Sequence, residues 1–271
     1  QPPRPTPTSS LIQGAIDAVI AERLSGCANP DDCNDRLVKF AMLEKTKGPI
    51  HEACRARIVD DITRARSSLL AVYPRVPPAL KAEIFDIFDQ GWDNLPHGVD
   101  YQFTAFTIDG LESPSREVRQ AAARLMAHKP ISQVGHFAID ATMDDPSLML
   151  ATLMAIENTR FRVASRWVIA QLVNPAPEIR VQAARTIASF GRGSVPFLRE
   201  RVDDPDAATR AAVMGAWLLV ATLDDEPAFE TWLKDHGAHD TATAAKLTAA
   251  LAAIQAGKYK PDIPPRPPLK F

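Results

Sequence analysis

The sequence has few cysteines, few histidines, little net charge and no long apolar run. Its 271 residues include three cysteines and six histidines, and the net charge is −2. No run reaches the roughly 18 uncharged apolar residues of a membrane-spanning helix, so we expect no membrane span. The near-neutral charge lacks the positive excess that neutralises nucleic-acid phosphates, which argues against a nucleic-acid partner. A glycine-rich phosphate loop and a Gly-x-Ser-x-Gly elbow are also absent from the sequence.

A short pattern recurs from residue 113 onward. It consists of a polar residue, a proline and, five positions after the proline, an arginine. The copies are Ser113-Pro114 with Arg119, Asn174-Pro175 with Arg180, Asp204-Pro205 with Arg210, and a degenerate Asp145-Pro146 with Ala151 at the arginine position. The prolines recur about every 30 residues, which is typical of helical solenoids. We expect the polar residue to cap a helix and the proline to open it, where an amide hydrogen has no partner.

Apolar residues three and four positions apart predict amphipathic helices along the chain. The expected helices cover 11–26, 33–47, 50–73, 77–88 and 99–111, then 116–127, 131–143, 147–157, 160–173, 178–190, 195–202 and 207–223, and finally 227–234 and 241–256. The predicted fold is all-α, an α-solenoid of helical hairpins with extended proline-rich termini. Its parts would be a proline-rich segment (1–10), divergent helices (11–98), repeats (99–223), capping helices (224–257) and a proline-rich tail (258–271).

The stretch from Asn174 to Gly191, followed by Ser194 to Pro205, resembles HEAT repeats, especially the short variety known from phycobilisome lyases. The shared features are an Asp-Pro-like turn, an Ile-Arg pair, an alanine-rich helix, a glycine and a Val-Pro-x-Leu helix. The resemblance covers residues 114–223, about 40% of the chain. It implies a structural ladder in which each arginine reaches the turn of a neighbouring repeat. The implied ladder residues are Arg119, Arg180 and Arg210, with Asp145, Asn174 and Asp204 as turn partners.

Some HEAT-repeat proteins are enzymes, and three of their activities require residues that can be looked for in this sequence. The deoxyhypusine hydroxylase type needs several His-Glu pairs for two irons, and His51-Glu52 alone cannot supply them. A tetrapyrrole lyase would need a residue in the repeats to hold a chromophore, and only the lone His128 and His136 are present there. The pair His236 and His239 could bind a metal, but a glycine-containing turn is better explained as a solvated loop. We therefore predict no metal, no cofactor and no catalytic residues.

The third enzymatic alternative is a HEAT-like DNA glycosylase, which uses a basic inner face with tryptophans. Arg124 and Arg185 occupy equivalent repeat positions, and Trp167 and Trp217 could line the same face. These four residues are the candidate inner-face binding residues. Tryptophans on amphipathic helices more often pack in a core, so this interpretation is secondary. Clustered arginines around the two tryptophans would favour it.

The N-terminal cysteines bear on the cellular compartment. Cys27 closes the first expected helix and Cys33 opens the second, so we expect them to form a disulfide, whereas Cys54 would lie at the opposite end as a buried thiol. An exported protein would begin with such a proline-rich stretch at Gln1 after removal of a signal peptide. We therefore predict an exported protein, periplasmic or extracellular. The alternatives are a trimmed chain and a cytoplasmic protein with reduced cysteines.

The end of the chain, residues 261–271, is too rich in proline to form a helix. It is either a strap along the domain, which we favour, or a polyproline ligand for another protein. The apolar side chains of Leu269 and Phe271 indicate that the end of the chain packs against another surface. Taken together, the sequence predicts a non-catalytic scaffold with a protein partner. The alternatives are the nucleic-acid enzyme and a tetrapyrrole lyase or isomerase.

Overall fold

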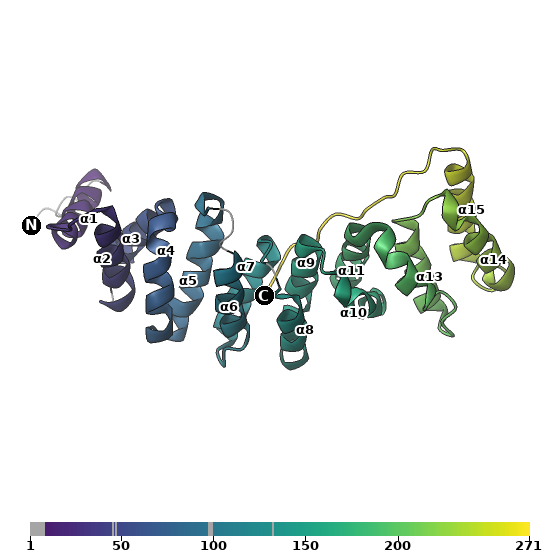
Figure 1. The fold of residues 1–271 in the computed structure, drawn as a ribbon, viewed down its shortest axis with the longest axis horizontal. Helices are drawn as coiled ribbons and strands as arrows, with labels where there is room; N and C mark the ends of the chain where they lie inside the picture. Colours follow the sequence, from purple (N-terminus) through teal and green to yellow (C-terminus); the bar gives the residue numbers. More distant parts are fainter. Residues whose placement is uncertain (1–8, 45, 47, 97–99, 132) are drawn as a thin grey trace, which may run out of the picture. The chain divides into compact units, whose positions relative to one another are not determined.

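A computed structural model describes residues 9–44, 46, 48–96, 100–131 and 133–271 (Figure 1). These residues form α-helices, short 3₁₀ turns and loops, and no strand occurs among them. The all-α class predicted from the sequence is therefore confirmed. The chain divides into two compact units, residues 1–125 and 126–271. Most of the predicted N-terminal segment lies outside the described residues, because the first helix begins at Ser9.

The N-terminal unit consists of short helices that pack on their neighbours in sequence. Helix α2 packs on α1, α3 and α4, and α5 packs on α3 and α4. The helices are α1 (Ser9–Leu24), α2 (Pro30–Leu43), α3 (Gly48–Asp60), α4 (Ile62–Val72), α5 (Pro78–Gly91) and α6 (Asp100–Leu111), and α7 (Arg116–His128) contains the boundary between the units. The helix expected at 99–111, despite its partly alternating pattern, is present as α6.

The single helix expected at 50–73 is wrong, because the helix is interrupted at Asp61. This residue has non-helical backbone angles (φ −114°, ψ 39°). Its carboxylate accepts hydrogen bonds from the side chains of Asn34 and Arg64, each at 2.9 Å. Aspartate competes well with helical backbone through such bonds, so the helix ends and a new one starts one residue later.

An aromatic cluster fills the core of the N-terminal unit. Phe85 and Phe106 stack with ring centroids 4.0 Å apart, and Tyr73 meets Phe106 edge-on at 4.8 Å. Gly110 lies against this cluster, and a Cβ atom there would come within 2.7 Å of the Cβ atom of Ala122. Glycine is therefore needed at this position to let α6 and α7 approach.

The C-terminal unit alternates longer and shorter helices. Helix α9 packs on α11, α11 on α13 and α13 on α15, while α8, α10, α12 and α14 pack on the helices that follow them. The bounds are α8 (Gly135–Asp144), α9 (Met149–Thr159), α10 (Ser165–Ala170), α11 (Pro177–Phe190), α12 (Val195–Arg199), α13 (Ala207–Leu218), α14 (Glu226–His236) and α15 (Thr241–Gln255). The helix expected at 160–173 is shorter than predicted, because 3₁₀ turns flank α10 on both sides.

The recurring polar-proline pair forms a turn, and this corrects the expected helix cap. In each copy the polar side chain accepts from the amide two residues later, at 3.0 to 3.3 Å. Helices α11 and α13 then begin at Pro177 and Ala207, two residues after the pattern's proline. Short Asx-type turns of this kind satisfy the backbone before the helix starts, so the prediction placed the cap too early.

The arginine of each pattern closes its own turn. Arg180 donates from Nη1 to the main-chain oxygens of Asn174 and Pro175, at 2.8 and 2.9 Å. Arg119 and Arg210 make the same pair of bonds with residues 113–114 and 204–205. One guanidinium therefore satisfies two carbonyls that precede the helix, which explains why the arginine follows the proline at a fixed distance.

The degenerate copy closes its turn by another route. Its turn carbonyls, from Asp145 and Pro146, accept from the amides of Leu148 and Met149 in a 3₁₀ turn. Ala151 stands where the arginine would be and is fully buried. The backbone thus replaces the guanidinium at this repeat.

Candidate functional site

The proline-rich tail lies along the C-terminal unit. After α15 the chain turns back in an extended conformation and passes α13 and α11 to reach α9 (Figure 1). The Tyr259 hydroxyl donates to the main-chain oxygen of Leu218 at 2.8 Å, and Arg266 reaches the end of α9. The predicted strap is therefore the arrangement seen in the structure.

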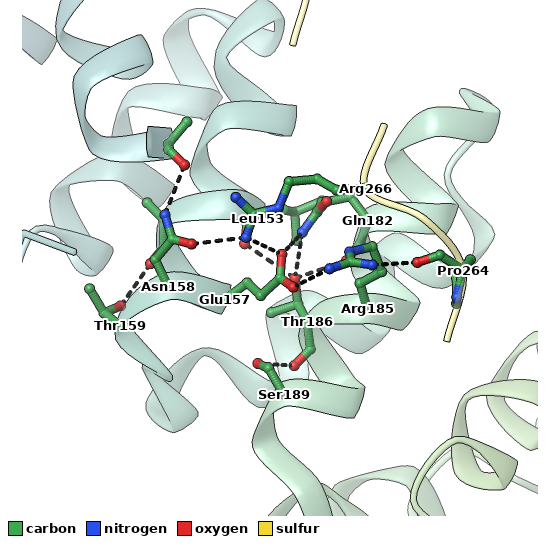
Figure 2. Close-up of polar contacts among 12 residues, drawn as sticks. Leu153, Glu157, Asn158, Thr159, Gln182, Arg185, Thr186, Ser189, Pro264 and Arg266 are labelled. Atoms are coloured by element: carbon green, nitrogen blue, oxygen red, sulfur yellow. Dashed lines mark hydrogen bonds and ion pairs between the residues drawn. The ribbon is translucent and has the colours of Figure 1, made fainter. Parts of the chain in front are cut away.

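The tail and two helices meet at the carboxylate of Glu157 (Figure 2). Arg185 donates to its Oε1 at 2.9 Å, while Gln182 and Arg266 donate to its Oε2 at 2.6 and 2.9 Å. The Glu157 side chain is only 11% exposed. One nearly buried carboxylate thus accepts from two arginines and an amide, which is a dense set of charge-assisted hydrogen bonds.

Local sequence explains why these groups converge. Gln182 and Arg185 are three residues apart on α11 and so lie on one face of the helix, which packs on α9. Glu157 directly follows the run of buried residues in α9. The helix ends soon afterwards, because the backbone of Arg160 adopts a left-handed conformation (φ 51°). Thr186, one position after Arg185, donates to the Leu153 carbonyl at 3.2 Å and links the two helices below the cluster.

Two further bonds fix the tail beside Glu157. Arg266 donates to the side-chain oxygen of Asn158 at 2.9 Å, and the amide of Asn158 donates to the carbonyl of Ala127 at 2.8 Å. Arg185 donates to the main-chain oxygen of Pro264 (Figure 2). Arg185 therefore contacts both the helix carboxylate and the tail backbone.

The tail ends beside an apolar groove of about 760 Å³. Leu150 and Ile179 line it from α9 and α11, and Pro268 and Phe271 line it from the tail. The groove also includes parts of two recurring turns, among them Pro146 and Pro175. Phe271 remains 39% exposed, so the tail only partly fills this space.

The other candidate inner-face residues do not join this cluster. Arg124 pairs with Asp86 at 3.2 Å in the N-terminal unit. Trp167 is half-buried on α10. Trp217 is 2% exposed and packs edge-on against Phe229, with the Arg199 guanidinium 5.3 Å from its ring centroid. Of the four, Arg185 alone lies at the tail.

The predicted ladder residues have mixed partners. Arg210 reaches beyond its own turn to Asp240 with two bonds of 2.7 and 3.0 Å, and these hold the pKa of Asp240 below its ordinary value. The two hydrogen bonds of Arg180 described above stay within its own turn. Asp204 accepts from Arg201 at 2.7 Å. The ladder as a whole stays a prediction.

The histidines considered from the sequence have carboxylate neighbours or exposed side chains. Nε2 of His51 is 2.7 Å from Oε1 of Glu83, and Nε2 of His236 is 2.9 Å from Oδ1 of Asp203. Within the described part of the chain, no three His, Cys, Asp or Glu side chains are grouped to hold a metal ion. His128 and His136 are exposed. No helix in the described ranges has the length and apolar character needed to cross a membrane.

The cysteines are arranged as the sequence predicts. Cys27 and Cys33 lie at disulfide distance, with Cα atoms 5.3 Å apart. Cys54 is fully buried, and desolvation raises the pKa of its thiol.

Sequence analysis missed Glu157, Gln182 and Arg266, although one signal was present. Glu157 is the only charged residue of α9 and follows seven consecutive buried residues. A carboxylate next to such a buried run needs a cationic or hydrogen-bonding partner, because burying an unpaired charge is costly. Comparison with protein families, with curated proteins and with solved structures finds no match to this chain.

Proposed function

We propose that this chain is a non-catalytic α-solenoid scaffold that binds other proteins. The stepwise packing of α9, α11, α13 and α15 supports a repeat architecture in the C-terminal unit. The side-chain-to-amide hydrogen bond that recurs at residues 113, 145, 174 and 204 supports it as well, since each of these turns begins an equivalent repeat. Stacks of this kind present extended surfaces for binding.

The observation that carries the proposal is the bound tail. Arg185 and Glu157 hold an extended segment of chain that belongs to no helix of the stack. Main-chain hydrogen bonds combined with contacts to individual side chains are a common way to recognise extended peptides. A surface that already binds one such segment is suited to binding others.

The nucleic-acid alternative receives less support from the residues that would carry it. Trp217 is buried, so its ring is not available for stacking on a base. Arg166, next to Trp167, makes two bonds with Glu200 at 2.8 and 2.9 Å. These paired charges do not form the positive face that phosphate binding requires.

We also propose that the protein works in an oxidising compartment, as an exported protein. The Cys27–Cys33 pair supports this location, since disulfides persist outside the reducing cytosol.

Affinity purification from the source cells tests the scaffold function. The intact chain serves as bait beside a matched chain carrying Glu230→Gln, an exposed position on α14, and a scrambled-sequence control. We expect the same proteins to be enriched by the first two baits over the control. The proposal is wrong if no protein is enriched while nucleic acid co-purifies and is released by raised salt.

A further inference from the structure

We infer that the face of α9 and α11 around Glu157 is a recognition site for an extended, proline-rich segment of a partner protein that carries one arginine. The chain's own tail occupies this site in cis. The inference rests on the proposed scaffold function and names the class of partner for one part of it.

The contacts made by the tail are ones that another peptide can reproduce. Arg185 binds the main-chain oxygen of Pro264, and proline-rich segments leave such oxygens free because their extended helix has no internal hydrogen bonds. Pro264 and Pro267 are both half-buried. Their spacing of three residues is one turn of a polyproline helix, so they form one face toward the protein. Arg266 then reaches Glu157 and Asn158.

The tail is held loosely. None of residues 258–271 is fully buried, and the Arg266 side chain is 37% exposed. Water therefore competes for the exposed guanidinium of this ion pair, although the Glu157 carboxylate is nearly buried. The tail can therefore leave without unfolding the helices beneath it.

The site stays complete when the tail leaves. Glu157 keeps its bonds with Arg185 and Gln182, both supplied by α11. The nearly buried carboxylate is then still paired, so an open site costs little. If the tail were the only partner of Glu157, its departure would leave a nearly buried charge unpaired, and the tail would then be a permanent part of the fold.

The tail also leaves room unused. The apolar groove of about 760 Å³ remains beside Phe271 with the tail in place. This volume is within the range of sites that hold sizeable ligands. A partner segment with larger apolar residues after its arginine would fill the groove better than Pro268 and Phe271 do.

A second copy of the chain is a less suitable occupant. Tyr259 is bonded to Leu218 of α13, four residues after the end of α15, so each tail is guided onto its own unit. Linkage of this kind gives the tail an effective concentration on the order of 1 mM. If the free segment binds with a Kd of about 10 μM, the tail weakens binding of a partner roughly 100-fold.

A labelled synthetic peptide of residues 259–271 tests the site by fluorescence anisotropy against full-length chains. We expect weak binding to the unaltered chain and at least about tenfold tighter binding to the Arg266→Ala chain, whose own tail is loosened. Adding Glu157→Gln to Arg266→Ala should weaken binding about tenfold, whereas adding Glu230→Gln should leave it unchanged. Melting temperatures confirm that each variant is folded.

Any of four results would overturn the inference. Equal binding to the unaltered and Arg266→Ala chains, or no binding to either, would show that the tail does not compete for a site. Binding that ignores Glu157→Gln would place the peptide elsewhere. A dimer seen by light scattering that Arg266→Ala dissolves would make a second copy the occupant. If the inference fails while the purification still enriches proteins, the scaffold function stands without this site.

Discussion

The hydroxyl of Tyr259 donates to the main-chain oxygen of Leu218 at 2.8 Å and so joins the tail to α13. Burial raises the pKa of this phenol above its ordinary value. The neutral donor is therefore kept through the physiological range, and the bond is lost only as the pH rises above about 10. Tyr259 thus sets where the tail begins to follow the helices.

Replacing this hydroxyl should free the start of the tail. In Tyr259→Phe the ring is kept while the bond, worth about 1 kcal/mol, is lost. We expect trypsin to cleave after Lys258 about fivefold faster, with the melting temperature of the helices nearly unchanged. Timed proteolysis read by mass spectrometry measures this. Tyr101→Phe, at an exposed position, is the control, and equal cleavage rates in both variants would contradict the prediction.

Loss of the Glu157 carboxylate should destabilise the C-terminal unit. Glu157→Ala leaves Arg185 without its helix partner in a nearly buried place, so we expect a loss of about 2 kcal/mol in the free energy of unfolding. Glu157→Gln keeps an acceptor and should lose about half as much. Urea unfolding followed by circular dichroism measures both. Glu230→Gln should change stability by less than about 0.5 kcal/mol, and an equal loss there would refute the role of Glu157.

The Arg210–Asp240 pair predicts an acid-dependent loss of stability. Arg210 holds the pKa of Asp240 below its ordinary value of 3.8, so the pair stabilises the fold fully above that pH. Its contribution is lost as the pH falls through the lowered pKa. We expect Asp240→Asn to melt at a lower temperature than the unaltered chain at pH 6, and the gap to narrow as the pH is lowered below the ordinary pKa of an aspartate. A gap that persists at the lowest pH would mean that the carboxylate charge is not the cause.

The cysteines should differ sharply in reactivity. We expect the native protein to weigh two hydrogens less than the fully reduced chain, because Cys27 and Cys33 are joined. Iodoacetamide should label Cys54 only after denaturation, since its thiol is fully buried and its raised pKa keeps it protonated. Intact mass before and after denaturation measures both. Labelling of three cysteines in the native protein would contradict the prediction.

The recurring turn shows what the sequence could predict. The positions of Pro175 and Arg180 are fixed by contacts within six residues, so the pattern located the turn correctly. The expected start at residue 178 lies within one residue of the observed Pro177, but the helix cap was wrongly assigned to Asn174, which bonds to the amide of Ala176 ahead of the helix. Residue propensities do not tell whether an asparagine side chain will accept from an amide in the turn or from an amide inside the helix.

The site beside the tail lay beyond sequence reasoning for a different reason. Glu157 and Arg266 are 109 residues apart, and no local period relates them. The tail composition predicted an extended strap, but composition does not say which helix the strap meets. Only packing of α9 on α11 brings Arg185 to the same carboxylate and so creates the binding surface.

The buried Ala151 gives the C-terminal unit a defect in an otherwise periodic array. A ladder arginine at this position would lie over the carbonyls of Asp145 and Pro146, at the rim of the groove beside Phe271. The alanine removes one cation from that rim and leaves room for an apolar side chain beside Pro146. A repeat can thus gain space for a ligand by losing one residue of its pattern, because the main-chain hydrogen bonds of a 3₁₀ turn replace those of the missing arginine.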